Sequence, residues 1–133
     1  MPDTSNRQSA DMRRAKNAYD KVIAIKGREA GDRKKYASRA KDVGALIMTA
    51  GLGSTLAFLR AKDKTSQELY RHISTWVVPS LQADDQRELH TAVMDEDTSY
   101  YRRATTEAIA YATWLKRWVE GEFGDELLEA TGD

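Results

Sequence analysis

The near absence of proline is the feature that most limits how this chain can fold. Its 133 residues include only two prolines, Pro2 and Pro79, so the long segment between them has no residue that breaks a helix by lacking an amide hydrogen. Ala, Lys, Arg, Glu and Leu are plentiful, and these residues favour helix. No stretch alternates between apolar and polar residues for long enough to form a strand. The sequence therefore predicts an all-α fold.

In the first half of the chain, apolar residues recur at spacings of three and four, as on the buried face of a helix. One helix is predicted from Ser9 to Arg28. Its buried stripe is Met12, Ala15, Tyr19, Val22, Ile23 and Lys26. A second helix is predicted to begin near Asp32, a good N-cap residue. Its buried stripe is Tyr36, Ala40, Val43, Ile47 and Ala50. Beyond Gly51 and Gly53, which end this helix or allow a close approach to another, the apolar surface continues to about Lys62.

Capping signals divide the middle of the chain. Thr65 and Glu68 have the spacing of a capping box, and the helix that follows has Leu69, Ile73, Trp76 and Val77 on its stripe. Pro79 is predicted to stop that helix, because the residue before a proline is pushed out of the helical region. Asp84 or Asp85 is predicted to cap a short helix.

The C-terminal part is predicted to form one long helix. Residues 95–98 read as a loop and cap, and the helix spans residues 99–122, with Gly124 closing it. Its inner stripe is Ala104, Ala108, Tyr111, Leu115, Trp118 and Val119. The prediction is a compact bundle of five to six helices in one domain, residues 1–133, with flexible ends at 1–8 and 125–133.

Charge is distributed unevenly although the net charge is zero. Residues 1–64 contain 15 Lys and Arg against 7 Asp and Glu, whereas residues 65–133 contain 6 against 14. This asymmetry indicates a polyanionic partner for the basic half, or pairing between the halves of neighbouring copies. An ordinary, well-solvated bipolar surface explains it equally well.

Composition excludes several kinds of protein. The chain has no cysteine, which rules out disulfides and thiolate metal sites. The longest apolar stretch, around residues 45–59, is interrupted by glycine and hydroxyl residues and is too short to cross a bilayer. The polar start carries no secretory signal. We expect a cytoplasmic protein with no membrane contact.

Catalytic and metal-binding patterns are weak. The only histidines, His72 and His90, lie in different predicted helices and are expected to be hydrogen-bonded boundary residues. Asp95, Glu96 and Asp97 lack the glycine and terminal glutamate of a calcium loop and suit the start of a helix. The chain is therefore predicted to be no enzyme and to need no metal, cofactor or small-molecule substrate. A magnesium nuclease that uses these three acids is the last-placed alternative.

Basic side chains are the better candidates for a function. Lys and Arg bind phosphates through charge and counterion release, and no pattern for base readout is present, so RNA binding here would be independent of sequence. The candidate contacts are Arg13, Arg14, Lys34, Lys35, Arg39 and Lys41, with Lys116 and Arg117 as secondary candidates. Trp114 lies off the buried stripe of the last helix and is the candidate for a partner interface.

Two segments of the chain resemble a known family. They are VGALIMTAGLGSTLAFL, residues 43–59, and YRRATTEAIAYATWLKR, residues 101–117. Together they are similar to the signature regions of the small helical subunit of Cmr-type (type III-B) CRISPR effector complexes. That family has a Gly-Leu pair before an apolar run, then Thr-x-Glu-Ala leading to Tyr and to Trp-Leu-Lys-Arg. Ala50 and Gly44 depart from the pattern, since the family often has Asn and Pro there.

The resemblance implies a helical bundle whose copies stack beside the backbone subunits that hold the guide RNA. It implies a place along the path of the target RNA, which the backbone subunit cuts, and no nuclease role for the small subunit. The implied partners are the other Cmr subunits, further copies of this chain, and the guide and target RNA. The alternative is a small helical adaptor or regulator that binds protein only.

Overall fold

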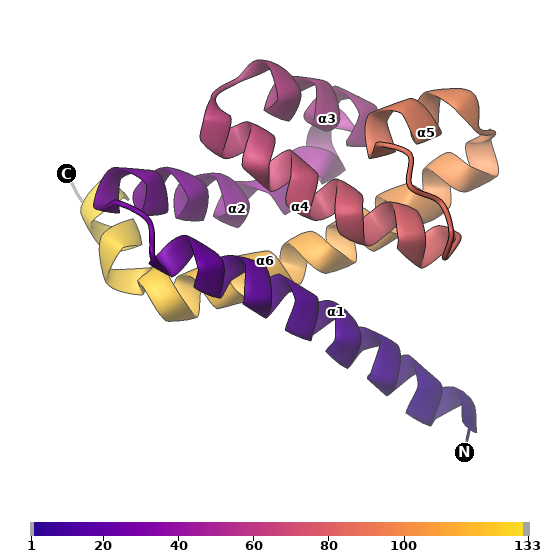
Figure 1. The fold of residues 1–133 in the computed structure, drawn as a ribbon, viewed down its shortest axis with the longest axis horizontal. Helices are drawn as coiled ribbons and strands as arrows, with labels where there is room; N and C mark the ends of the chain where they lie inside the picture. Colours follow the sequence, from indigo (N-terminus) through magenta and orange to yellow (C-terminus); the bar gives the residue numbers. More distant parts are fainter. Residues whose placement is uncertain (1, 132–133) are drawn as a thin grey trace.

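Six α-helices and no strand make up residues 2–131, the part of the chain whose backbone this computed structural model describes. Side chains are described for residues 9–127. The helices are α1 (Pro2–Lys26), α2 (Ala30–Ala50), α3 (Leu52–Ala61), α4 (Lys64–Leu81), α5 (Leu89–Asp95) and α6 (Thr98–Thr131). They pack around one hydrophobic core, which confirms the predicted all-α bundle (Figure 1). The predicted flexible ends fall largely outside the described side chains.

Helix α6 is the centre of the bundle, in contact with α1, α2, α4 and α5 (Figure 1). The predicted stripe is buried, except that Trp118 is only partly so. The predicted end at about Glu122 coincides with a kink at Phe123, whose backbone is not helical (φ −127°, ψ 23°), and a further helical segment runs from there to Thr131. Phe123 and Leu127 are both buried in the core, and their burial offsets the low helix propensity of Gly124.

Helix α2 buries four of the five predicted residues, Tyr36, Ala40, Val43 and Ile47, while Ala50 is exposed. The stripe predicted for α1 is partly wrong: Met12 is 54% exposed, and Ala18 and Ile25 are buried in addition to Ala15 and Val22. Figure 1 shows the N-terminal end of α1 extending past the other helices. No neighbouring element covers this end fully, so the apolar spacing alone misassigns Met12.

Three predicted N-caps are wrong. Helix α2 begins at Ala30, two residues before Asp32. Helix α4 begins at Lys64, and the Asp63 carboxylate accepts a hydrogen bond from the Ser66 N–H at 2.8 Å. Asp63 thus satisfies a first-turn donor that the Thr65 and Glu68 pattern would have served. Helix α5 follows Glu88, because Asp85 is engaged with Arg87 at 2.7 Å instead.

Pro79 does not stop α4, which continues to Leu81. The proline lies in the last turn, where its missing N–H removes only one hydrogen bond. Val78 is buried and Leu81 packs against the core, so apolar burial stabilises the final turn. The predicted cap before the last helix is confirmed, since Asp97 accepts a hydrogen bond from the Tyr100 N–H at 2.9 Å. Over residues 2–131, every helix is too short or too polar to span a bilayer.

Candidate nucleic-acid interface

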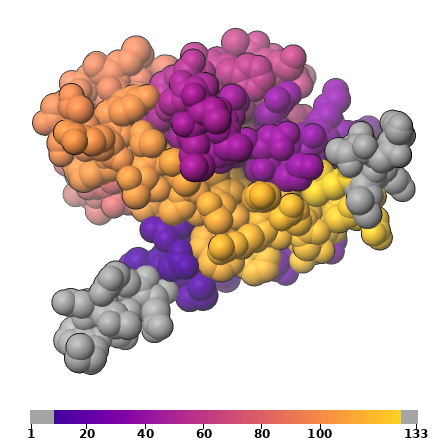
Figure 2. Space-filling view, turned by 180° about the vertical axis from the view of Figure 1, so that it is seen from behind, coloured from indigo at the N-terminus to yellow at the C-terminus, as the bar shows by residue number. Residues whose placement is uncertain are grey.

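Helices α2 and α6 run antiparallel and carry most of the basic candidates. Arg33 near the start of α2 donates to Glu126 near the end of α6 at 3.0 Å. At the other end of the pair, the N–H of Gly53, just beyond α2, donates to the Tyr101 hydroxyl at 2.9 Å. Figure 2 shows this side of the molecule, with the later part of α2 beside α6.

Lys41 and Lys116 lie at the same level of this helix pair. A Cβ on Gly44 would be 3.5 Å from the Cβ of Ala112, so the backbones approach closely there. Lys41 is about one turn before Gly44, and Lys116 is about one turn after Ala112. Since the helices are antiparallel, the fold brings together two candidates from opposite halves of the sequence. Lys116 is exposed and Lys41 is half-buried.

Lys35 and Arg39 are two further basic candidates on α2. Lys35 is exposed, and the Arg39 guanidinium lies 5.0 Å from the centroid of the Phe58 ring. The backbone hydrogen bond from Ser66 lowers the pKa of Asp63, and the charges of Arg39 and Lys35 lower it further. Both cations therefore lie near the start of α4 as well as on α2. Lys34 is half-buried on the same helix.

Arg14 faces the interior of the bundle. Its Nε and Nη2 atoms donate to the two carboxylate oxygens of Glu107 at 2.6 and 2.9 Å, and Nη1 donates to Asp11 at 2.6 Å. Its side chain is 17% exposed, and the hydrogen bond to Glu107 raises its pKa. The structure uses this guanidinium to join α1 to α6, so Arg14 is left out of the RNA surface proposed below.

Glu107 also binds Trp76, a residue whose position at the surface the sequence did not reveal. The Trp76 Nε1–H donates to Glu107 at 2.8 Å, and the indole stacks on the Tyr111 ring with centroids 5.7 Å apart and planes at 11°. The Tyr111 hydroxyl donates to Asn17 at 2.7 Å. Helical spacing puts Trp76 on a buried stripe, and only the contact with α6 shows that its ring is held by polar partners and remains partly open.

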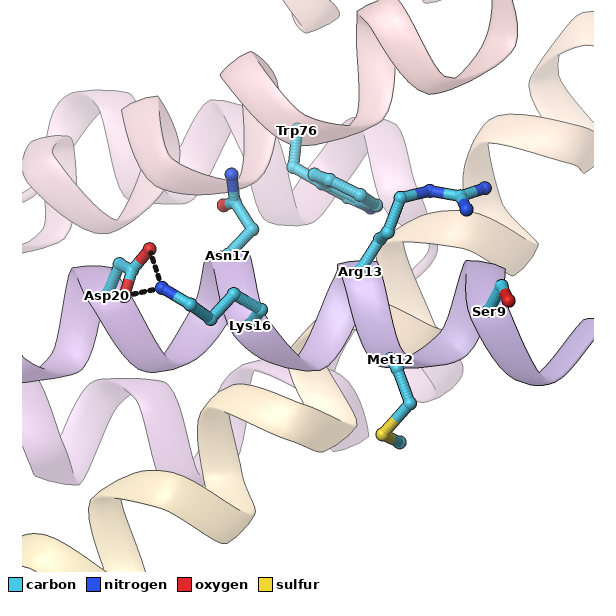
Figure 3. A pocket seen from close by; sticks show the side chains of 7 residues that line it. All are labelled: Ser9, Met12, Arg13, Lys16, Asn17, Asp20 and Trp76. Atoms are coloured by element: carbon cyan, nitrogen blue, oxygen red, sulfur yellow. Dashed lines mark hydrogen bonds and ion pairs between the residues drawn. The ribbon is translucent and has the colours of Figure 1, made fainter.

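Trp76 lines a shallow hollow of about 530 Å³ between α1 and α4. Figure 3 shows the indole between Arg13 and Asn17 of α1, with the Arg13 guanidinium extending away from the ring and Lys16 paired to Asp20. The Lys16 ammonium lies 2.9 Å from the Asp20 carboxylate. Arg13 is exposed and forms no ion pair within residues 9–127. The structure therefore separates Arg13 from the candidates on α2.

Trp114 is half-buried, in line with its predicted partial exposure. Its Nε1–H donates to Asp11 at 3.0 Å, and its ring stacks against Trp118 with centroids 5.6 Å apart. The Arg117 guanidinium lies 4.7 Å from the centroid of the Trp114 ring. This arrangement positions Trp114 and Arg117 as a unit near α1. Their roles in binding a partner or RNA stay predictions.

Both histidines are hydrogen-bonded to buried tyrosines, as predicted for boundary residues. The Nδ1 atoms of His72 and His90 lie 2.6 Å from the hydroxyls of Tyr36 and Tyr70, respectively. Burial lowers the pKa of His72 to about 4. At neutral pH His72 is therefore an uncharged hydrogen-bonding group within the fold.

The acidic run before α6 serves the fold. Asp97 caps α6, and Glu96 pairs with Arg87 at 2.9 Å. Among the residues whose side chains are described, no group of three or more His, Asp or Glu is arranged to hold a metal ion. The magnesium nuclease alternative therefore has no support from the arrangement of these acids.

Comparison with known proteins gives one consistent result. The sequence model of the family described as CRISPR-associated protein (Cas_Cmr5) matches residues 10–122. The CRISPR system Cmr subunit Cmr5 of Thermus thermophilus is 33% identical over 107 residues, which are 80% of this chain and 89% of that protein. A crystal structure of a Cmr5 family protein from Thermus thermophilus superposes with a TM-score of 0.71 at 29% identity, covering 84% of this chain and 95% of the other. The resemblance seen in residues 43–59 and 101–117 is thus confirmed, and the chain belongs to the Cmr5 family of CRISPR-associated proteins.

Proposed function

We propose that this protein is a non-catalytic small subunit of a type III-B Cmr effector complex that targets RNA in antiviral defence. In that complex it contributes to assembly and presents a basic surface along the path of the guide and target RNA. The observation that carries this proposal is the family match over residues 10–122. The Thermus thermophilus relative is itself a Cmr subunit. The partners in this proposal are the backbone subunits, further copies of this chain, and the two RNA strands.

The proposed RNA surface is the α2–α6 basic face, defined here as Lys35, Arg39, Lys41 and Lys116. These side chains are exposed or half-buried on two antiparallel helices. Lysine and arginine neutralise phosphates without reading base edges. The face therefore suits a subunit that must accept any guide and any target sequence.

The test is a charge reversal in the reconstituted complex. The variant combines Lys35→Glu, Lys41→Glu and Lys116→Glu. It is expected to weaken binding to RNAs of unrelated sequence by the same factor, because phosphate contacts carry no sequence information. The slope of log K against log salt should decrease in magnitude by about 0.7 for each phosphate of a single strand that is no longer neutralised. Fluorescence anisotropy at several salt concentrations measures both quantities.

A matched control separates a local contact from the change in net charge. Lys62→Glu, Arg71→Glu and Arg103→Glu change the charge by the same amount at exposed positions outside the α2–α6 basic face. This control is expected to keep the wild-type salt slope. If both triple variants bind RNA equally, or if neither changes the slope, the α2–α6 basic face is the wrong assignment.

A protein-only adaptor is the second candidate function. Two apolar side chains, Met48 and Met94, are 72% and 73% exposed, and exposed methionines suit contacts with a protein surface. Purification of the tagged protein with its bound partners distinguishes the two candidates. Recovery of backbone subunits with short guide RNA supports the effector role, whereas recovery of other proteins without RNA supports the adaptor.

A further inference from the structure

The indole of Trp76 is held rigidly where it meets the surface between α1 and α4. The ring stacks on Tyr111 at 5.7 Å, and its Nε1–H is fixed by Glu107 at 2.8 Å. Glu107 is fixed in turn by two hydrogen bonds from Arg14. Because Trp76 also lines the hollow, part of this ring faces solvent (Figure 3). The result is an aromatic surface that needs no rearrangement to accept a planar ligand.

Polar groups with unused hydrogen-bonding capacity surround this aromatic surface. The stem of Arg13 lies beside the ring and its guanidinium extends away from it, with no ion-pair partner within residues 9–127 (Figure 3). Asn17 uses its Oδ1 atom to accept from Tyr111, and its amide N–H groups have no partner among the described residues. The charges of Lys16 and Asp20 balance each other at 2.9 Å. The hollow therefore offers one net positive charge and an amide donor beside an aromatic face.

We infer that this hollow binds one unstacked base of a single-stranded RNA. The base stacks on Trp76, the adjoining phosphate pairs with the Arg13 guanidinium, and Asn17 donates to the edge of the base. Every base has a π-face, so such stacking tolerates any sequence. A guanidinium is well suited to a phosphate oxygen pair. Among the lining residues only Met12 and Trp76 are apolar, which favours a nucleotide over an apolar segment of protein.

The inference rests on the proposed function, because it takes its ligand to be the RNA of the assembly. It concerns different elements, however, since the hollow is formed by α1 and α4 and the basic face by α2 and α6. The two assignments can therefore fail separately. If Lys35→Glu, Lys41→Glu and Lys116→Glu weaken RNA binding while changes at Trp76 do not, the hollow is the wrong assignment. If changes at Trp76 weaken RNA binding while the triple variant does not, the basic face is the wrong assignment and the hollow is supported.

The test compares a short oligoadenylate with an abasic oligonucleotide of the same length, using the full-length protein. Trp76→Leu is expected to weaken oligoadenylate binding about tenfold and to leave binding of the abasic strand unchanged. Only a base stacked on the indole predicts this difference between the two strands. An equal loss for both strands, no loss for either, or failure of the wild-type protein to bind oligoadenylate overturns the inference.

Further variants distinguish loss of the base contact from loss of the fold. Trp76→Phe keeps an aromatic face and is expected to retain most of the preference for oligoadenylate over the abasic strand. Arg13→Gln changes an exposed side chain. It should weaken the binding of both strands and reduce the magnitude of the salt slope by about 0.7. Trp118→Leu removes another half-buried indole, outside the hollow, and should leave the preference for oligoadenylate intact. A preference lost equally in Trp118→Leu, or an unchanged salt slope in Arg13→Gln, also contradicts the inference.

Discussion

The hydroxyl of Tyr101 accepts a hydrogen bond from the backbone N–H of Gly53 at 2.9 Å, and this contact joins the two segments that carry the family likeness. Gly53 lies in the first turn of α3, where N–H groups have no partner within the helix. The N-cap of α3 is Gly51, which has no side chain to offer. Tyr101 therefore supplies from α6 the oxygen that a Ser or Asp cap would supply locally.

Tyr101→Phe is expected to lower the free energy of unfolding by about 1 kcal/mol, the usual cost of losing an N-cap acceptor. Urea denaturation followed by circular dichroism measures this change. Tyr19→Phe serves as the control, because the hydroxyl of this half-buried tyrosine has no hydrogen-bond partner among the described residues. Equal stability of Tyr101→Phe and the wild type would show that water satisfies the Gly53 N–H equally well.

Gly51 and Gly53 should differ sharply when each is replaced by alanine. Gly51 has φ +92° and ψ 157°, a region essentially restricted to glycine, so Gly51→Ala is expected to cost about 1–3 kcal/mol. A Cβ on Gly53 would lie 3.6 Å from the Tyr101 hydroxyl, an ordinary contact, and alanine favours helix by about 1 kcal/mol. Gly53→Ala should therefore be neutral or stabilising. Thermal unfolding of the two variants tests this contrast, which a similar loss of stability in both would contradict.

Glu107→Gln should destabilise the fold by about 2 kcal/mol, in the range for hydrogen bonds to charged groups. The carboxylate accepts two hydrogen bonds from Arg14 and one from Trp76, and its side chain is 17% exposed. Asp20→Asn is the matched control, since its pair with Lys16 is exposed and such pairs contribute little. Urea midpoints that shift equally in the two variants would show that Glu107 contributes no more than a surface charge.

Stability should fall as the pH decreases from about 6.5 to about 4. Burial lowers the pKa of His72 from 6.5 to about 4, so the unfolded chain binds a proton at this residue before the folded chain does. The stabilisation is complete above pH 6.5, decreases below it, and is lost once the pH is below about 4. Glu68, Lys21, Arg71 and Arg28 are the charged groups that act on this imidazole.

Urea unfolding at a series of pH values measures this dependence. The full change corresponds to about 3 kcal/mol, since one pKa unit is about 1.4 kcal/mol. His72→Gln should flatten the profile between pH 6.5 and 4. The pKa values of Asp11, Asp63 and Asp85 are lowered from 3.8, so their contributions are lost at lower pH. A wild-type profile that is already flat in this window would contradict the role of His72.

Local patterns determined the helical class, much of the core and one cap. Tyr36, Ala40, Val43 and Ile47 are buried at the predicted spacing, because a helix repeats every 3.6 residues whatever its partners are. Asp97 caps α6 as predicted, since it bonds to an N–H only three residues away. The family could also be identified from the order of residues, since it depends on the motifs in residues 43–59 and 101–117.

Only the tertiary structure decided what the individual side chains do. Arg13 and Arg14 are equivalent by charge and by position in the sequence, yet Arg14 is bound to Glu107 and Arg13 is free to face the hollow. Adjacent residues point about 100° apart on a helix, and the direction that meets Glu107 depends on where α6 packs. Lys41 and Lys116 lie at the same level of the α2–α6 pair because of how these two helices pack. Helical periodicity is a property of neighbours in sequence, whereas these contacts join residues that only the packing of distant helices brings together.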